Sequence, residues 1–282
     1  MTHTPPGPHR AHPFAHLHRR VLESPVGLGW NRGREIELMH RAMGFAALGF
    51  VTLVPLLVVV AAADPVSAEG FARWLGQGLG VSRESEQQVE ELFGVPGQAL
   101  QRTTAFGLAA LVVFGLTFGS AVQTGYEKVW DLPTARWHTM WRHVVWLGLL
   151  IFFLVVFFNL PEPDSFWVNA VTTAGDLLGT VLFFWVSQHL LLGGRVRWRA
   201  LLPGAVATAL SLLGLRVFSQ LVFSPLIASN TVTFGPFGTV LVIQSWLVGV
   251  GVVVYGGALA GRLVHEELTR RKLLRAIEHD VL

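Results

Sequence analysis

Two long apolar segments near the C-terminus, residues 200–224 and 237–261, constrain the fold more than any other feature of this sequence. Each exceeds the roughly 20 residues that an α-helix needs to cross about 30 Å of hydrocarbon. The short segment between them, 225–236, has no charged residue and is expected to form a loop. One charged residue, Arg216, interrupts the first segment, and an arginine at that depth is costly unless it faces a partner or a wet cavity. We therefore expect a membrane protein in which Arg216 has a specific role.

Composition places the chain among polytopic helical membrane proteins. Of its 282 residues, 52% are hydrophobic and 14% are charged. The mean hydropathy of +0.51 is typical of chains with several membrane spans. Apolar runs of spanning length predict an all-α fold with six transmembrane helices, at about residues 43–63, 104–122, 143–160, 169–192, 200–224 and 237–261.

The segments around these spans are more polar. Residues 1–30 are rich in Pro, His and Arg and are expected to form a disordered cytoplasmic tail, because they cannot bury enough apolar surface to fold. The transmembrane domain is expected over residues 31–264. It includes a long loop outside the cytoplasm at 64–102 and a polar loop at 123–142. Residues 265–282 are predicted to form an amphipathic helix in the cytoplasm.

The distribution of basic residues predicts the orientation. Seventeen of the 21 Lys and Arg residues lie in the N-terminal tail, the loops after the second and fourth spans, and the C-terminal tail, whereas three lie in the opposite loops. Because Lys and Arg collect on cytoplasmic loops, we expect both termini in the cytoplasm and an even number of spans. The same rule accounts for the formal net charge of +3, so no nucleic-acid partner is expected.

Two charges lie inside the predicted spans, Asp176 in the fourth and Arg216 in the fifth. Both lie roughly 12 Å from the expected outer ends of their helices, and consecutive helices joined by a short loop are usually neighbours. We therefore expect the two side chains to face each other or to share a water-filled cavity. Gln220, one turn from Arg216, and Gln244 of the sixth span are further polar candidates. Two interpretations stay open: an ion pair that only fixes packing, which often adds little net stability, or an anion-binding site.

Several kinds of chemistry find no support in the sequence. The chain has no Cys, which excludes disulfides, thiolate catalysis and Cys-based metal sites. Metal-dependent phosphodiester cleavage requires clustered ligands, whereas five histidines, His40, His138, His143, His189 and His265, are dispersed near predicted membrane boundaries. The five histidines of the N-terminal tail have no acidic partner and no fixed ligand spacing. No Ser-His-Asp order, Walker loop or dinucleotide fingerprint is present. We therefore expect no catalytic residues, no metal site and no cofactor, and do not expect the chain to be an enzyme.

Four segments resemble one protein family, in the right order: TLVPLL at residues 52–57, TGYEKVWDLP at 124–133, LLPGAVATAL at 201–210, and the glycine-rich run from FGPFG to AGRL at 234–263. Over residues 41–267 the chain is similar to the YihY/virulence factor BrkB family of bacterial inner-membrane proteins. The resemblance implies six transmembrane helices and a multi-pass location in the inner membrane. Arg216 falls where a basic residue is typical of the family, so the resemblance marks this position as a functional site. Members have been labelled as a ribonuclease and as a serum-resistance factor, and others have been linked to the movement of envelope lipids, so no single activity is implied.

The intramembrane charges, the proline-interrupted spans and the glycine pairs favour transport or flipping of an anionic lipid or small solute. In that case the substrate site would comprise Arg216, Asp176, Gln220 and Gln244. The alternative, from a different class, is a non-catalytic membrane scaffold or envelope-assembly factor whose cytoplasmic tails bind partners or anionic lipid. Membrane lipids are expected partners in both cases, and the sequence leaves a homo-oligomer open.

Overall fold

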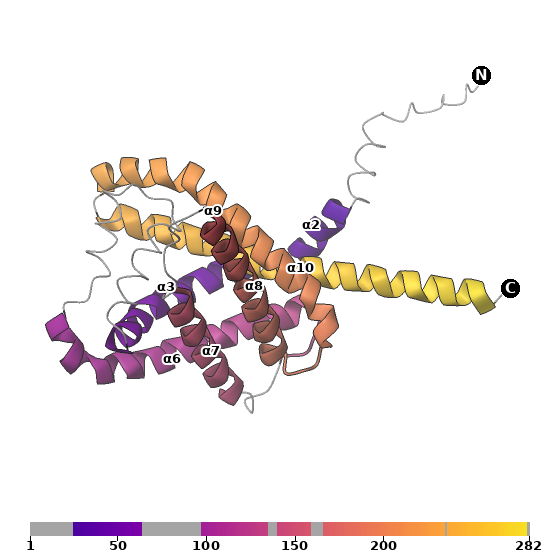
Figure 1. Ribbon diagram of the computed structural model, residues 1–282, viewed down its shortest axis with the longest axis horizontal. Helices are drawn as coiled ribbons and strands as arrows, with labels where there is room; N and C mark the ends of the chain where they lie inside the picture. The colour runs from indigo at the N-terminus through magenta and orange to yellow at the C-terminus, as the bar shows by residue number, and fades with distance from the viewer. Residues whose placement is uncertain (1–24, 64–96, 135–139, 159–165, 235, 281–282) are drawn as a thin grey trace, which may run out of the picture.

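The structure, a computed structural model, describes residues 25–63, 97–134, 140–158, 166–234 and 236–280, with the backbone alone for some helical residues beside the gaps. This part of the chain contains seven α-helices and no strand (Figure 1). The helices are α2 (Pro25–Glu35), α3 (Leu38–Ala63), α6 (Gly97–Val129), α7 (Met140–Phe158), α8 (Phe166–Leu191), α9 (Trp198–Phe234) and α10 (Pro236–Asp280). The predicted all-α fold is therefore confirmed.

Each of the six long helices contains most or all of one predicted span. Within the described residues, three segments are long and apolar enough to cross a membrane: Phe106–Val129, Trp198–Ser219 and Val240–Arg275. Leu38–Leu53 and Met140–Val156 are shorter apolar segments. Six spans with both termini in the cytoplasm therefore remain a prediction. The expected tail at 1–30 and the loop at 64–102 lie largely outside the described residues.

Two predicted loops are wrong in part. The segment 225–236, expected to be a loop, is helical up to Phe234, and α10 begins at Pro236. The segment 123–142, also expected to be a loop, is helical up to Val129 at the end of α6 and again from Met140 in α7. A helix satisfies its own backbone polar groups, and this favours its continuation wherever the surroundings are apolar.

The C-terminal ends of α6 and α8 are fixed by the same hydrogen-bond pattern. After α6, the amide of Leu132 donates to the carbonyl of Glu127 at 2.8 Å and the amide of Asp131, at φ 53°, donates to Lys128 at 3.2 Å. After α8, Gly194 and Gly193 donate to His189 and Leu190, both at 3.1 Å, with Gly193 at φ 65°. Both ends are Schellman motifs, in which a left-handed residue stops the helix and turns the chain. Each motif leads into a connection, which comprises residues 130–139 after α6, described as far as 134, and residues 192–197 after α8.

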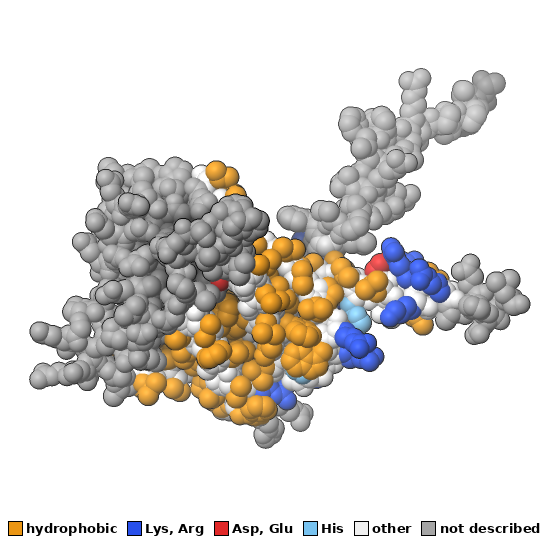
Figure 2. Space-filling view, viewed as in Figure 1, with side chains coloured by type: hydrophobic (Ala, Val, Ile, Leu, Met, Phe, Trp, Pro, Cys, Tyr) orange, Lys and Arg blue, Asp and Glu red, His pale blue; other side chains and the backbone are white. Residues whose placement is uncertain are grey.

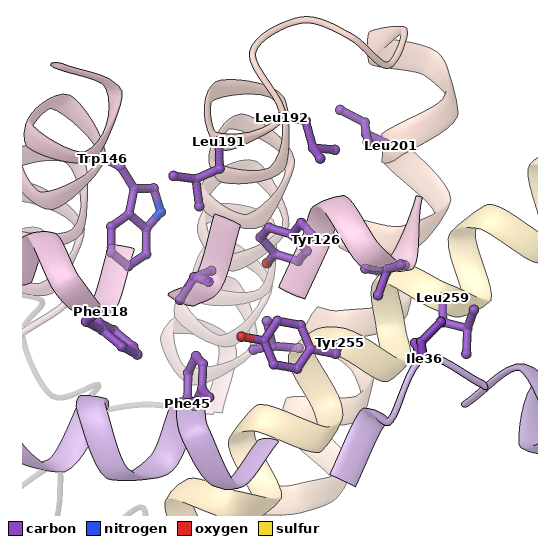
Figure 3. Packing of buried hydrophobic residues seen from close by; sticks show 14 residues of the cluster. Ile36, Phe45, Phe118, Tyr126, Trp146, Leu191, Leu192, Leu201, Tyr255 and Leu259 are labelled. Atoms are coloured by element: carbon purple, nitrogen blue, oxygen red, sulfur yellow. The ribbon is translucent and has the colours of Figure 1, made fainter. Parts of the chain in front are cut away.

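The largest buried cluster surrounds two tyrosines. The ring centroids of Tyr126 of α6 and Tyr255 of α10 lie 6.0 Å apart, edge to face. Figure 3 shows Phe45, Phe118 and Trp146 on one side of this pair and Ile36 and Leu259 on the other. The cluster therefore joins α3, α6, α7 and α10 near the end of the bundle at which α6 stops.

Helices α9 and α10 lie side by side over much of their length (Figure 1). Small residues allow this approach: a Cβ built on Gly257 of α10 would lie 2.7 Å from the amide nitrogen of Thr208 of α9 and 2.8 Å from its Cα. Gly261 of α10 comes equally close to the backbone of Gly204 in α9. In lipid, such close backbone packing is a main source of helix association.

The flanks of the bundle are apolar. Large side chains such as Phe106, Leu178 and Leu221 are 70–76% exposed, and hydrophobic atoms cover much of the described surface seen in Figure 2. Lys and Arg side chains gather instead toward the end from which α10 projects, which we call the basic end (Figure 2). Apolar surface this extensive is unusual on a soluble monomer and fits contact with lipid.

Candidate functional site

A cavity of about 330 Å³ lies between the six long helices. Residues from every one of these helices line it: Phe45 of α3; Phe118, Val122 and Tyr126 of α6; Trp146, Leu150, Phe153 and Leu154 of α7; Thr173, Asp176, Leu177, Thr180, Phe183, Phe184 and Ser187 of α8; Ala209, Leu212, Leu213, Leu215 and Arg216 of α9; and Trp246, Val250 and Val254 of α10. No pair of helices could form it alone, so its shape depends on the packing of the whole bundle.

Both intramembrane charges line this cavity. Asp176 and Arg216 lie close enough for an electrostatic interaction, but the described residues contain no salt bridge between them. The Oδ1 atom of Asp176 is buried and has no hydrogen-bond partner within the described part of the chain. Arg216 is exposed as a residue, and its guanidinium has neither a hydrogen bond nor an ion pair with any described residue. The two charges share a cavity without neutralising each other by direct contact.

The expected depth of Arg216 has to be corrected. The estimate placed the outer end of the fifth span at residue 224, whereas α9 continues to Phe234. Arg216 therefore lies midway along α9 rather than near its end. An arginine in the middle of a long apolar helix needs a wet or charged environment even more than one near its end.

The remaining wall of the cavity is largely apolar, with aliphatic and aromatic side chains. Phe153 of α7 and Phe183 of α8 stack with ring centroids 4.4 Å apart, and Phe45 packs edge-on against Phe118 at 5.0 Å. Thr173 and Thr180 supply hydroxyl groups on the same helix as Asp176. Such an apolar chamber with a few polar groups on its wall is typical of small-molecule sites.

The two predicted glutamines are not placed at this site. Gln244 of α10 is half-buried and does not line the cavity. The side chain of Gln220 lies outside the described residues. Of the four predicted site residues, Asp176 and Arg216 are therefore the two that the structure brings together.

A second polar cluster, at the basic end, was not predicted from the sequence. Glu127 of α6 is 2% exposed, and its Oε1 accepts hydrogen bonds from Gln123 Nε2 at 2.8 Å and from Arg195 Nη2. His143 of α7 joins the cluster through a contact of 2.6 Å between its Nε2 and Gln123 Oε1. Because the amide nitrogen of Gln123 faces the carboxylate, its oxygen faces the histidine, so His143 donates from Nε2.

Arg195 ties the connection between α8 and α9 to this cluster. Its Nε donates to the carbonyl of Leu192 at 2.9 Å, and its Nη1 donates to Pro133 at 2.7 Å. Arg262 of α10 makes a similar tie, donating to the carbonyl of Val129 at 2.7 Å. Sequence reasoning counted Arg195 only as a marker of orientation. The spacing of Gln123 and Glu127, four residues apart, was a usable sign that α6 continues through both.

The apolar flanks, the all-helical bundle and the internal cavity define an integral membrane protein. Within the described residues, no three His, Asp or Glu side chains gather closely enough to hold a metal ion. The family model for Virulence factor BrkB matches residues 30–276, which is most of the chain. The protein belongs to this family. Comparisons with curated proteins and with solved structures found no match.

Proposed function

We propose that this protein is a carrier of the bacterial inner membrane that moves an anionic amphiphile, or a small anionic solute, through the cavity lined by Asp176 and Arg216. One observation carries the proposal: Arg216 lies midway along a long helix and lines an apolar cavity. Its guanidinium has no ion-pair partner among the described residues. A charge removed from water is strongly disfavoured unless something of opposite sign meets it.

The chemistry of the two side chains indicates an anionic group with further polar atoms. A guanidinium binds phosphate or carboxylate with paired, charge-assisted hydrogen bonds. Asp176 would repel a bare anion if it were alone, but beside Arg216 its carboxylate can accept hydrogen bonds from hydroxyl or ammonium groups of the same ligand. Thr180, one turn away on α8, donates its hydroxyl proton to the backbone carbonyl of Asp176 at 2.7 Å, and its oxygen can still accept a hydrogen bond from such a group.

The size and the walls of the cavity favour an amphiphile over a purely polar solute. Small-molecule sites usually measure about 300–1,000 Å³, so the volume of about 330 Å³ fits a headgroup but not a complete phospholipid. The aromatic wall around Phe153 and Phe183 suits the first part of an acyl chain. We infer that the headgroup enters the cavity while the chains remain in the surrounding lipid, without ATP hydrolysis or any other reaction catalysed by this chain.

Reconstitution into liposomes tests this proposal. One arm follows tail-labelled phospholipids with anionic or zwitterionic headgroups, using an impermeant quencher, and the other follows the flux of small anions. Transport of one anionic class is expected. Arg216→Gln should slow it by about tenfold or more, since a hydrogen bond to a charged group is worth roughly 1.5–3 kcal/mol.

Arg275→Gln is the matched control, because Arg275 is an exposed arginine near the C-terminal end of α10. It should transport at the wild-type rate. Equal rates for Arg216→Gln and the wild type, or no transport of either class by the wild type, would contradict the proposal.

The scaffold alternative has one observation in its favour. The C-terminal part of α10 projects from the bundle (Figure 1), and it exposes Leu268, Leu273 and Ile277 beside basic residues. Removing residues 265–282 separates the two functions. A carrier keeps its transport after this truncation, whereas a scaffold loses its cellular role while Arg216→Gln leaves that role unchanged.

A further inference from the structure

The cavity is closed at the basic end of the bundle. Its lining ends there at Tyr126 of α6, Trp146 of α7 and Ser187 of α8. Trp146 Nε1 donates a hydrogen bond to Ser187 Oγ at 3.2 Å, and Ser187 is 2% exposed. Beyond Ser187, Leu191 is fully buried. These buried side chains therefore bound the cavity toward the basic end.

The Glu127 cluster lies next to this closed end. Glu127 follows Tyr126 directly on α6, and His143 lies one turn before Trp146 on α7. The cluster joins α6 to α7 through Gln123, and it joins α6 to the connection between α8 and α9 through Arg195. Three of the four side chains are at least 93% buried, whereas the side chain of Arg195 remains 29% exposed. Arg195 thus lies at the boundary between solvent and the buried cluster.

The connection held by Arg195 is a sharp turn built on two glycines. Gly193 and Gly194 both have positive φ, at 65° and 72°. Residues that carry a side chain rarely adopt such φ values, and these values let the chain turn sharply here. A Cβ on Gly193 would also clash with the guanidinium of Arg142. Arg195 holds this turn with three hydrogen bonds, one of them to the buried carboxylate of Glu127. Release of that side chain would remove the polar tie between this turn and the buried end of α6, and apolar packing of Leu191, Leu192 and Leu201 against α6 would remain.

We propose that the Glu127–Arg195 pair, extended through Gln123 to His143, is the gate that closes the cavity toward the basic end, and that transport requires this pair to separate. This inference rests on the proposed carrier function. A buried ion pair is a poor source of net stability but fixes one arrangement against others, and removal of one partner leaves the other charge uncompensated. Such an ion pair therefore suits a switch between two packings of the helices better than it suits a permanent tie.

Cysteine labelling tests the gate without any transport measurement. The chain has no native Cys, so Ser187→Cys, a nearly isosteric change at the closed end of the cavity, gives a single reporter. Membrane vesicles of both orientations are exposed to an impermeant thiol reagent. With the gate intact, labelling from the basic end should be slow; with Glu127→Gln it should become about tenfold faster or more, because the open state gains population.

Two further variants keep the test decisive if Glu127→Gln does not fold. Arg195→Lys keeps the positive charge, but its single ammonium nitrogen cannot reach the three separate acceptors that Nε, Nη1 and Nη2 of Arg195 reach, so it should also speed labelling. Reversal of both charges, Glu127→Arg with Arg195→Glu, should slow labelling again relative to either single reversal. Glu267→Gln is the matched control, because its partner Arg271 lies on the same exposed stretch of α10 at 2.7 Å; it should not change labelling.

Fast labelling of Ser187→Cys alone from the basic end, or equal rates in Arg195→Lys and the control, would overturn the gate. The outcome is separable from that of the carrier proposal. Failure of transport in the wild type leaves the labelling result standing as evidence of a two-state closure, whereas unchanged labelling with Arg216-dependent transport rejects the gate and keeps the carrier.

Discussion

Glu127 is a buried acidic residue whose charge is stabilised by hydrogen-bond donors. Its carboxylate is 2% exposed and accepts hydrogen bonds from Gln123 and Arg195. Glu127→Leu leaves the guanidinium of Arg195 and the amide of Gln123 without their acceptor, and removal of one partner of a buried pair costs about 3–5 kcal/mol. We expect a marked fall in the thermal unfolding midpoint in detergent.

The control for this prediction is Glu267→Leu, which breaks an exposed pair worth no more than about 1 kcal/mol. Its unfolding midpoint should stay near that of the wild type. Similar midpoints for Glu127→Leu and Glu267→Leu would show that the buried cluster contributes no specific stability.

Arg216 should behave in the opposite way. It makes no hydrogen bond or ion pair with the described residues, so Arg216→Gln removes only the electrostatic interaction with Asp176 and takes a charge out of an apolar cavity. We expect an unfolding midpoint equal to or above that of the wild type, as is common where a functional residue is held at the expense of stability. Expression level and thermal unfolding measure this. A loss of more than about 1 kcal/mol would favour an ion pair that only fixes packing.

At the scale of the helices, alanine substitutions at two adjacent glycines of α10 should have opposite effects on stability. Gly257 packs against the backbone of Thr208, so Gly257→Ala forces α9 and α10 apart and should cost about 1–3 kcal/mol. Gly256 has no atom within 4 Å of a Cβ built on it. Gly256→Ala should instead stabilise the helix by up to about 1 kcal/mol. Thermal unfolding of the two single variants decides the point, and a lower midpoint for Gly256→Ala than for Gly257→Ala would contradict the packing of α9 on α10.

The sequence predicts the helices because long apolar runs in lipid have few alternatives to helical structure. It fails where a helix continues through residues that usually end one. The short segment 225–236, between two apolar runs, was expected to form a loop, but α9 continues to Phe234. Gln123 and Glu127 suggested the end of a span, but α6 contains both because His143 and Arg195 satisfy their polar groups. Such partners are distant in the sequence, so the pattern alone could not identify them.

Part of the candidate site was also predictable from the sequence. Asp176 and Arg216 are isolated charges in apolar runs, and each is visible in the sequence without knowledge of its neighbours. Their presence on one cavity followed from the adjacency of α8 and α9. The contribution of all six long helices to the wall did not follow, because it depends on how the whole bundle packs.

For the molecule as a whole, the predicted topology can be checked with single cysteines in the native background. Cysteines at Arg197, between α8 and α9, and at Arg275, near the C-terminal end of α10, should react with an impermeant reagent only from the cytoplasmic side. A cysteine at Gln98, in the first turn of α6, should react only from the opposite side. Reaction of Arg197→Cys and Gln98→Cys from the same side would exclude six spans with both termini in the cytoplasm.

The most direct test of the central claim is the affinity of the cavity for an anionic phospholipid. Native mass spectrometry of the protein released from lipid nanodiscs counts bound lipids for the wild type, Arg216→Gln and the control Arg275→Gln. If the guanidinium of Arg216 meets an anionic headgroup, Arg216→Gln should weaken binding of one anionic lipid by about tenfold or more, while the control binds as the wild type does. Equal binding by all three proteins would contradict the account.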